Sequence, residues 1–182
     1  STPKPSSAAS DVYKRQGLYY PLGLGPHGLV SEALLLHMKS PAIHGALNMI
    51  YRYGITEDEA YAQKVYPYLR GVADFWEKDL VCRDGVYHVV GDGMHERTDG
   101  NIRDNGVPED PVNTLGYLKT FFTWMPRISE ALDLDEKKRE KWLEIAENLA
   151  PYPKGTIREI QENPTLWKEV CLLYTSPSPR DS

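Results

Sequence analysis

The sequence has few cysteines, no long apolar run and no excess of basic residues. Of its two cysteines, only Cys82 lies within residues 17–170, so that stretch forms no internal disulfide and is compatible with either redox compartment. No segment approaches the roughly 18 consecutive apolar residues that a transmembrane helix needs. The formal net charge is −5, and an acidic chain without a basic cluster does not fit a nucleic-acid-binding protein. We therefore expect neither a membrane nor a nucleic acid as partner.

Spacings typical of metal and nucleotide sites are missing too. Two Asp/Asn/Gly triplets, at 99–101 and 104–106, lack the twelve-position spacing of a calcium loop that ends in glutamate. The glycines at 23 and 25 follow no strand and open no helix, so they form no dinucleotide-binding fingerprint. Four histidines are dispersed and show no H-E-x-x-H spacing: they are His27, His37, His44 and His88. The sequence thus predicts no metal ion and no cofactor.

The two ends of the chain differ from the rest in composition. Residues 1–16 (STPKPSSAASDVYKRQ) and 171–182 (CLLYTSPSPRDS) are rich in Ser, Pro and Thr and show neither helical nor strand periodicity. Both resemble the translated adapter read-through found in assembled environmental sequence data, and a natural disordered tail would explain one such end but not two. We expect residues 17–170 to be a fragment of a longer protein, with 17 basic and 24 acidic residues and a net charge of 17 − 24 = −7. A signal peptide would precede this stretch, so a periplasmic or secreted location stays open.

The central stretch fits one domain, because it is long enough and apolar enough to bury a core. Helices are predicted over residues 28–39 and from Pro41, with Ser40 as N-cap and Gly54 as the stop signal. The apolar face of the second helix is predicted from spacings of three and four: it consists of Ile43, Leu47, Ile50 and Tyr51.

A third helix is expected to start at a T-x-x-E capping box formed by Thr56 and Glu59 and to break or kink at Pro67. Beyond the proline, an apolar stripe continues at helical spacing: it consists of Leu69, Val72, Ala73, Trp76 and Leu80. The triplet Arg-Asp-Gly at 83–85 then turns the chain into residues 86–90 (VYHVV), the one β-rich run, which we predict to be a short strand or hairpin arm.

Two further helices are predicted in the second half of the chain. The first has Asp110 as cap, Pro111 as opening residue and Pro126 as a kink. The second covers residues 136–149, after a turn at 133–135. Their predicted inward-facing residues are Leu115, Leu118, Phe122 and Met125 in the first helix and Trp142, Ile145 and Leu149 in the second. The fold class predicted from these patterns is all-α, built from helical hairpins, and the patterns alone do not specify a closed toroid.

Residues 91–113 (GDGMHERTDGNIRDNGVPEDPVN) interrupt this helical pattern. The segment has no apolar period, and its acidic residues are too many for a core segment. Segments longer than about 12 to 15 residues without secondary structure are usually functional or disordered. Because well-patterned elements flank this one, we interpret it as a functional loop. Its acidic residues include Asp92, Glu96, Glu109 and Asp110.

Two stretches of the chain resemble known carbohydrate-active enzymes. Residues 40–81 carry an aromatic-x-Tyr helix end, an acidic pair and the motif Tyr-Pro-x-Leu-x-x-x-Ala-x-Phe-Trp, which runs from Tyr66 to Trp76. This order resembles a hairpin of the six-hairpin, (α/α)6-barrel glycosidases. Residues 128–162 are similar to the helix pair and Leu-x-Pro-Tyr segment of glycoside hydrolase family 95, the α-L-fucosidase and α-L-galactosidase group. The resemblance implies a partial (α/α)6 toroid that acts on an oligosaccharide or glycoside.

In such barrels the catalytic acid lies on the loop after the Phe-Trp helix, so the resemblance implies Glu96 as general acid, with Glu109 as runner-up. It also implies substrate contacts by His95, Arg97 and Asn113. Family 95 carries Ser-Pro-Glu-Asn in this loop and family 65 carries Gly-Pro-Asp-Glu-Tyr, whereas this chain has GDGMHER at 91–97. The departure leaves the family and the sugar open, with a family 65-like α-glucoside hydrolase or phosphorylase as the alternative.

An inverting glycosidase needs a carboxylic acid that protonates the leaving oxygen and a carboxylate that activates water. The second group comes from a later hairpin in this clan, so we expect the fragment alone to be inactive. A plainer interpretation of Glu96 is a solvated loop acid paired with Arg97 or Arg103. The tryptophans could stack on sugars, although at helical spacing they are more often core residues. A non-catalytic helical-repeat binding or scaffold module is the rival from another class.

Overall fold

The computed structural model describes residues 17–18, 38–92 and 109–154. These residues form a mostly helical fold with a small two-stranded antiparallel sheet. In chain order the elements are α2 Pro41–Thr56, α3 Glu59–Asp79, β1 Val81–Arg83, β2 Val86–His88, α5 Val112–Ala131 and α6 Glu136–Glu147. Most of the helix predicted over residues 28–39 lies outside the described residues. None of the described helices is both long enough and apolar enough to cross a membrane.

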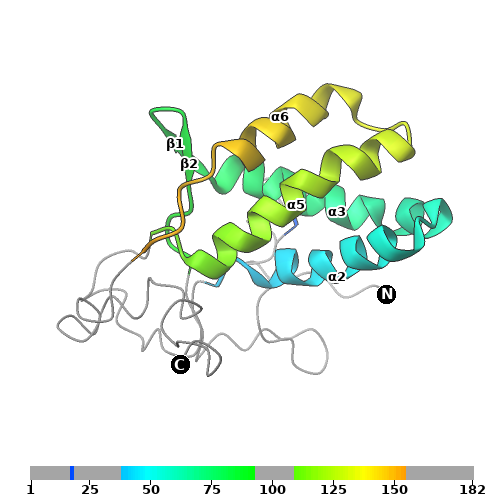
Figure 1. The fold of residues 1–182 in the computed structure, drawn as a ribbon, viewed down its shortest axis with the longest axis horizontal. Coiled ribbons are helices and arrows are strands. Elements are labelled where there is room, and N and C mark those ends of the chain that lie inside the picture. Colours follow the sequence, from blue (N-terminus) through cyan, green and yellow to red (C-terminus); the bar gives the residue numbers. More distant parts are fainter. Residues whose placement is uncertain (1–16, 19–37, 93–108, 155–182) are drawn as a thin grey trace, which may run out of the picture.

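The helices form two antiparallel hairpins that lie side by side (Figure 1). Helix α3 returns along α2, α6 returns along α5, and α5 packs against the other three helices. Helices α2 and α5 begin at the same end, because Asp92 accepts hydrogen bonds from the backbone N–H of Lys39 and from the hydroxyl of Thr114. Further along, the ring of Trp124 in α5 lies against Gly54 near the end of α2, so the two helices run in the same direction. The two hairpins therefore point in the same direction.

The apolar stripes predicted from the sequence form the core between these helices. Trp76 and Trp142 are fully buried, which confirms their interpretation as core residues. Trp124 is partly buried against the same core, and Trp167 lies outside the described residues. The other predicted stripe residues that are buried are Ile43, Leu47, Ile50, Leu69, Val72, Ala73, Leu80, Leu115, Leu118, Phe122, Met125 and Ile145.

The start of α2 is predicted correctly, but its end and part of its face are not. Pro41 occupies the first turn, although the Ser40 side chain makes no capping hydrogen bond. The helix passes through Gly54 to Thr56. Glycine stands there because a Cβ atom would come within 2.8 Å of the Trp124 ring, so the residue marks a close helix contact instead of a helix end. Tyr51, expected on the apolar face, is 50% exposed.

Helix α3 also starts and continues differently from the prediction. Its N-cap is Asp58, whose carboxylate accepts a hydrogen bond from the Tyr61 N–H at 3.0 Å. The hydroxyl of Thr56 instead donates to the carbonyl of Arg52, so the expected capping box does not form. The helix runs through Pro67 without ending. Pro67 is exposed on the helix surface, where water can satisfy the carbonyl that loses its hydrogen bond.

The predicted hairpin is present and is attached to the end of α6. Residues 84 and 85 form its two-residue turn and both have positive φ, 50° for Asp84 and 82° for Gly85, as a type I′ turn requires. The backbone of Tyr87 pairs with the chain after α6, through the carbonyl of Asn148 and the N–H of Ala150. The hairpin therefore stands where α6 ends, as Figure 1 shows.

The second pair of helices corrects two details of the prediction, and the kink at Pro126 stays a prediction. The N-cap of α5 is Pro111, because the side chain of Asp110 bonds elsewhere, to His88 and to the Val89 N–H. Pro126 lies inside α5, which continues to residue 131. Leu149 lies beyond the end of α6 and bridges to Tyr87. The helix is shorter than expected because the chain there pairs with the hairpin.

Polar contacts join α3 to α6 along the outside of the core. The ammonium of Lys138 contacts Asp74 at 2.9 Å and Glu77 at 2.9 Å. The indole N–H of Trp142 donates to Glu77 at 2.7 Å, and Arg70 contacts Asp135 at 2.9 Å. Carboxylates of one hairpin thus pair with cations of the other, and this pairing fixes how the two hairpins align.

Candidate functional site

The functional loop predicted from the sequence joins the described part of the chain at Asp92 and Glu109. His95, Glu96 and Arg97 lie outside the described residues, so their positions stay predictions. Of the other two site residues, Glu109 directly precedes Asp110, and Asn113 lies in the first turn of α5. Each flank of the loop is held by a separate group of polar contacts, one around Asp92 and one around Asp110.

Asp92 is fully buried and holds the start of both hairpins. Its Oδ1 accepts the N–H of Lys39 at 2.6 Å, and its Oδ2 accepts the hydroxyl of Thr114 at 2.6 Å. The side chain of Lys39 turns the other way, to Asp79 Oδ2 and the Val90 carbonyl, both at 2.8 Å. One carboxylate thus satisfies donors at the beginning of α2 and of α5, which fixes the point where the loop begins.

Burial raises the pKa of Asp92 above its ordinary value, and the hydrogen bonds from Thr114 and from the backbone of Lys39 and Ser40 oppose the shift. The net direction is upward because desolvation disfavours the charged form more than these donors favour it. The folded chain therefore takes up a proton at Asp92 more readily than the unfolded chain. Protonation of this group favours folding, and that contribution is lost as the pH rises through the folded pKa.

We expect Asp92→Asn to remove this pH dependence. Wild type should gain stability relative to the variant as the pH falls from neutral towards the ordinary aspartate value of 3.8, because only the wild-type group can take up the proton. Urea unfolding of both proteins at several pH values measures the difference, since the other carboxylates titrate alike in both. A stability difference that stays constant or shrinks as the pH falls would show that the pKa of Asp92 is not raised.

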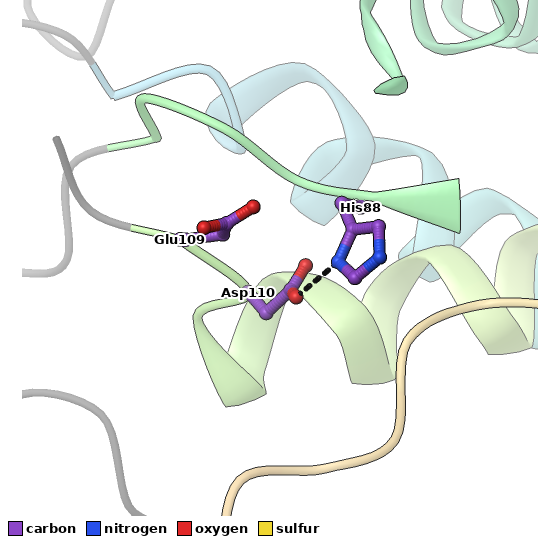
Figure 2. A group of neighbouring side chains, drawn as sticks. All are labelled: His88, Glu109 and Asp110. Carbon is purple, nitrogen blue, oxygen red and sulfur yellow. Dashed lines mark hydrogen bonds and ion pairs between the residues drawn. The ribbon is translucent and has the colours of Figure 1, made fainter. Parts of the chain in front are cut away.

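His88, Glu109 and Asp110 come together at the other flank of the loop, as Figure 2 shows. The imidazole Nδ1 of His88 lies 2.7 Å from Asp110 Oδ2, and Asp110 Oδ1 accepts the N–H of Val89 at 2.8 Å. The side chain of Glu109 lies beside them and is ion-paired with Arg83. One potential ligand atom from each of the three residues lies within 4.8 Å of the others. The cluster therefore combines an imidazole and two carboxylates in one small space.

The contacts of Glu109 and Asn113 bear on their predicted roles. Glu109 is ion-paired with Arg83, and its role as runner-up proton donor stays a prediction. Asn113 Oδ1 is buried and has no hydrogen-bond partner among the described residues. A buried acceptor without a donor costs stability unless a ligand or water supplies one. Asn113 therefore remains a candidate for contact with a substrate hydroxyl.

Sequence reasoning missed the roles of Asp92, His88 and Asp110. In the sequence Asp92 is one of several acidic residues of the loop, although the Gly residues on either side of it are a signal for a tight backbone approach. His88 shows no local ligand spacing, because its partner Asp110 is 22 residues away in the chain. Such long-range partners depend on the tertiary fold, and local spacing does not reveal them.

No protein-family model, curated protein or solved structure matches this chain. The resemblance to glycosidases therefore rests on the motifs within residues 40–81 and 128–162. The structure of the described residues provides further observations, namely the geometry of the helical hairpins and the contacts at the two flanks of the loop.

Proposed function

We propose that this chain is part of an (α/α)6 glycosidase, most similar to glycoside hydrolase family 95, that hydrolyses α-L-fucosides or α-L-galactosides with inversion. One observation carries the proposal: two helical hairpins lie side by side in the same direction, and the loop with Glu96 leaves and rejoins them at the end where α2 and α5 begin. A toroid of six hairpins would repeat this arrangement around a closed ring.

The direction of the hairpins supports a toroid arc. In a ring of hairpins, successive first helices run the same way, and each hairpin packs against the next. Helices α2 and α5 begin together at Asp92, and α3 is joined to α6 by Lys138 and Trp142. Ile55, near the end of α2, is 84% exposed, and contact with a further hairpin of the proposed ring would bury it.

The position of the loop supports an active site at this end. Phe75 and Trp76 pack edge to face near the end of α3, with ring centroids 5.3 Å apart, and the chain continues through the hairpin into the loop. Asp92 and Asp110 fix the two points at which the loop joins the hairpins. A catalytic group on the loop would therefore act at this end of the helices.

We assign the general acid to Glu96 and substrate contacts to His95, Arg97 and Asn113. The acid would protonate the leaving oxygen while a carboxylate from another hairpin, outside residues 17–170, activates water. The unpaired Oδ1 of Asn113 supports its part in this assignment, because a sugar hydroxyl would provide the missing donor. The proposal needs no cofactor.

The sugar is the least constrained part of the proposal. The segment GDGMHER departs from the loop motifs of both family 95 and family 65, so cleavage of α-glucosides by hydrolysis or phosphorolysis is the alternative. Enzymes distinguish such substrates by contacts that form with individual hydroxyl groups. The sugar is therefore best assigned by direct comparison of substrates.

A substrate panel tests the proposal in the longer protein that contains residues 17–170. We expect hydrolysis of α-L-fucosides or α-L-galactosides without added phosphate, measured as released sugar. Cleavage of α-glucosides, with or without a phosphate requirement, would move the assignment to the family 65-like alternative. No cleavage of any member of the panel would contradict the enzyme assignment and favour a helical-repeat binding module.

A further inference from the structure

The cluster of His88, Glu109 and Asp110 lies at the junction of β2 and α5, next to the point where residues 93–108 rejoin the described chain (Figure 2). We propose that this cluster binds a first-row divalent transition metal ion such as Zn²⁺. The ion would join the end of the hairpin to the start of α5. The proposal departs from the expectation that the chain holds no metal, which considered only local spacings along the sequence.

The distances within the cluster suit such an ion. A tetrahedral ion with ligands at about 2.1 Å places them about 3.4 Å apart, and the three ligand atoms here already lie within 4.8 Å of one another. The Nδ1 of His88 and the Oδ2 of Asp110 are 2.7 Å apart and are joined by a hydrogen bond. The ion would take the place of the proton in that hydrogen bond, and the carboxylate of Glu109 would become the third ligand.

The backbone holds two of the three ligands in place before any ion binds. The N–H of Asp110 donates to the Val89 carbonyl at 2.8 Å, and the N–H of Val89 donates back to Asp110 Oδ1 at 2.8 Å. A β-bridge between Val90 and Glu109 adds a second connection. His88 and Asp110 thus lie on backbone segments that are already paired. Metal binding therefore costs little conformational entropy at these two residues.

The side chain of Glu109 has to move furthest, because His88 and Asp110 only need to separate slightly to admit an ion. The contact of Glu109 with Arg83 is weak. The side chains of Glu109 and Arg83 are 43% and 51% exposed. An ion pair as exposed as this contributes roughly 0 to 1 kcal/mol. A divalent cation carries more charge than the guanidinium and binds the carboxylate directly, so it competes effectively for Glu109. The exchange would release Arg83 to solvent.

The ligand types select the class of metal. Imidazole together with carboxylates suits zinc, iron and manganese, whereas calcium and magnesium prefer sites made of oxygen atoms alone. Three protein ligands with a total charge of −2 leave at least one coordination position for water. We therefore expect Zn²⁺ to bind well and Mg²⁺ to compete poorly.

Titration with Zn²⁺ by isothermal calorimetry tests the site in the 182-residue chain. Cys82→Ser and Cys171→Ser are introduced first, so that neither thiol competes for the ion. We expect one equivalent of Zn²⁺ to bind, with affinity reduced at least about 10-fold by His88→Ala and by Glu109→Gln, since even the loss of an outer-shell partner has an effect of that size. Excess Mg²⁺ should leave the affinity unchanged.

His44→Ala and Glu130→Gln are the matched controls, because both residues are exposed and lie outside the cluster. They should bind Zn²⁺ as tightly as the parent. Circular dichroism checks the fold of each variant. If His88→Ala does not fold, the comparison of Glu109→Gln with the parent is decisive, because that substitution changes an exposed side chain and should leave the fold intact. Absence of Zn²⁺ binding in the parent, or equal affinity in the parent and in folded Glu109→Gln, would overturn the site.

Discussion

Glu96→Gln should reduce kcat/KM for natural glycosides by about 10² to 10⁴ in the longer protein, which is the typical contribution of a general acid. The reduction follows because glutamine cannot protonate the leaving oxygen. Substrates whose leaving group departs without a proton, such as glycosyl fluorides or activated aryl glycosides, should lose much less activity. Steady-state kinetics with one natural and one activated substrate measures the two losses side by side.

Two further variants make this result specific. Glu109→Gln replaces the runner-up acid, which is paired with Arg83, and should not show the dependence on leaving group. Glu130→Gln replaces an exposed acid near the end of α5 and should behave as wild type. If Glu109→Gln shows the loss that depends on the leaving group and Glu96→Gln does not, the acid is Glu109 and the assignment of Glu96 is wrong.

Trp142→Ala should lower the free energy of unfolding by about 3 to 5 kcal/mol, the usual range for removing a large aromatic side chain from a core. Trp142 is fully buried and packs where α6 meets α3, so the substitution leaves a cavity between the two hairpins. Urea denaturation followed by circular dichroism measures the loss. A change below about 1 kcal/mol would show that the hairpins do not pack as described.

A matched pair of milder substitutions separates the hydrogen bond from the packing. Trp142 donates its indole N–H to Glu77, whereas the indole N–H of Trp76 is buried without a partner among the described residues. Phenylalanine removes the N–H in both cases, but only Trp142→Phe leaves a charged acceptor short of a donor. We expect Trp142→Phe to lose about 1 kcal/mol more than Trp76→Phe. Equal losses would show that the bond to Glu77 contributes nothing.

The parts of the fold that depend on local periodicity were predictable. The stripes that include Leu69, Val72 and Trp76 are buried as expected, because a helix must turn its apolar face to a core. The sequence predicts that α2 ends at Gly54 and that α3 breaks or kinks at Pro67, whereas both helices continue past these residues. Both residues are common helix breakers, but here a tertiary contact with Trp124 explains the glycine and solvent exposure tolerates the proline.

The site was less predictable, because its geometry depends on contacts between distant segments. Asp92 meets Lys39 across 53 positions and Thr114 across 22, and no local pattern indicates such partners. The sequence predicts Asp110 as the cap of α5, since an acid before a proline is a common helix start. Its carboxylate instead forms hydrogen bonds with the His88 ring and the Val89 N–H. These partners are available only because β2 packs beside the start of α5.

The anomeric form of the first product tests the central proposal most directly. Proton NMR can follow the longer protein as it cleaves an α-L-fucoside or α-L-galactoside, before mutarotation mixes the anomers. The proposal predicts that the β-anomer appears first, because an inverting enzyme brings water to the face opposite the leaving group. First appearance of the α-anomer, or no cleavage of either glycoside, would contradict it.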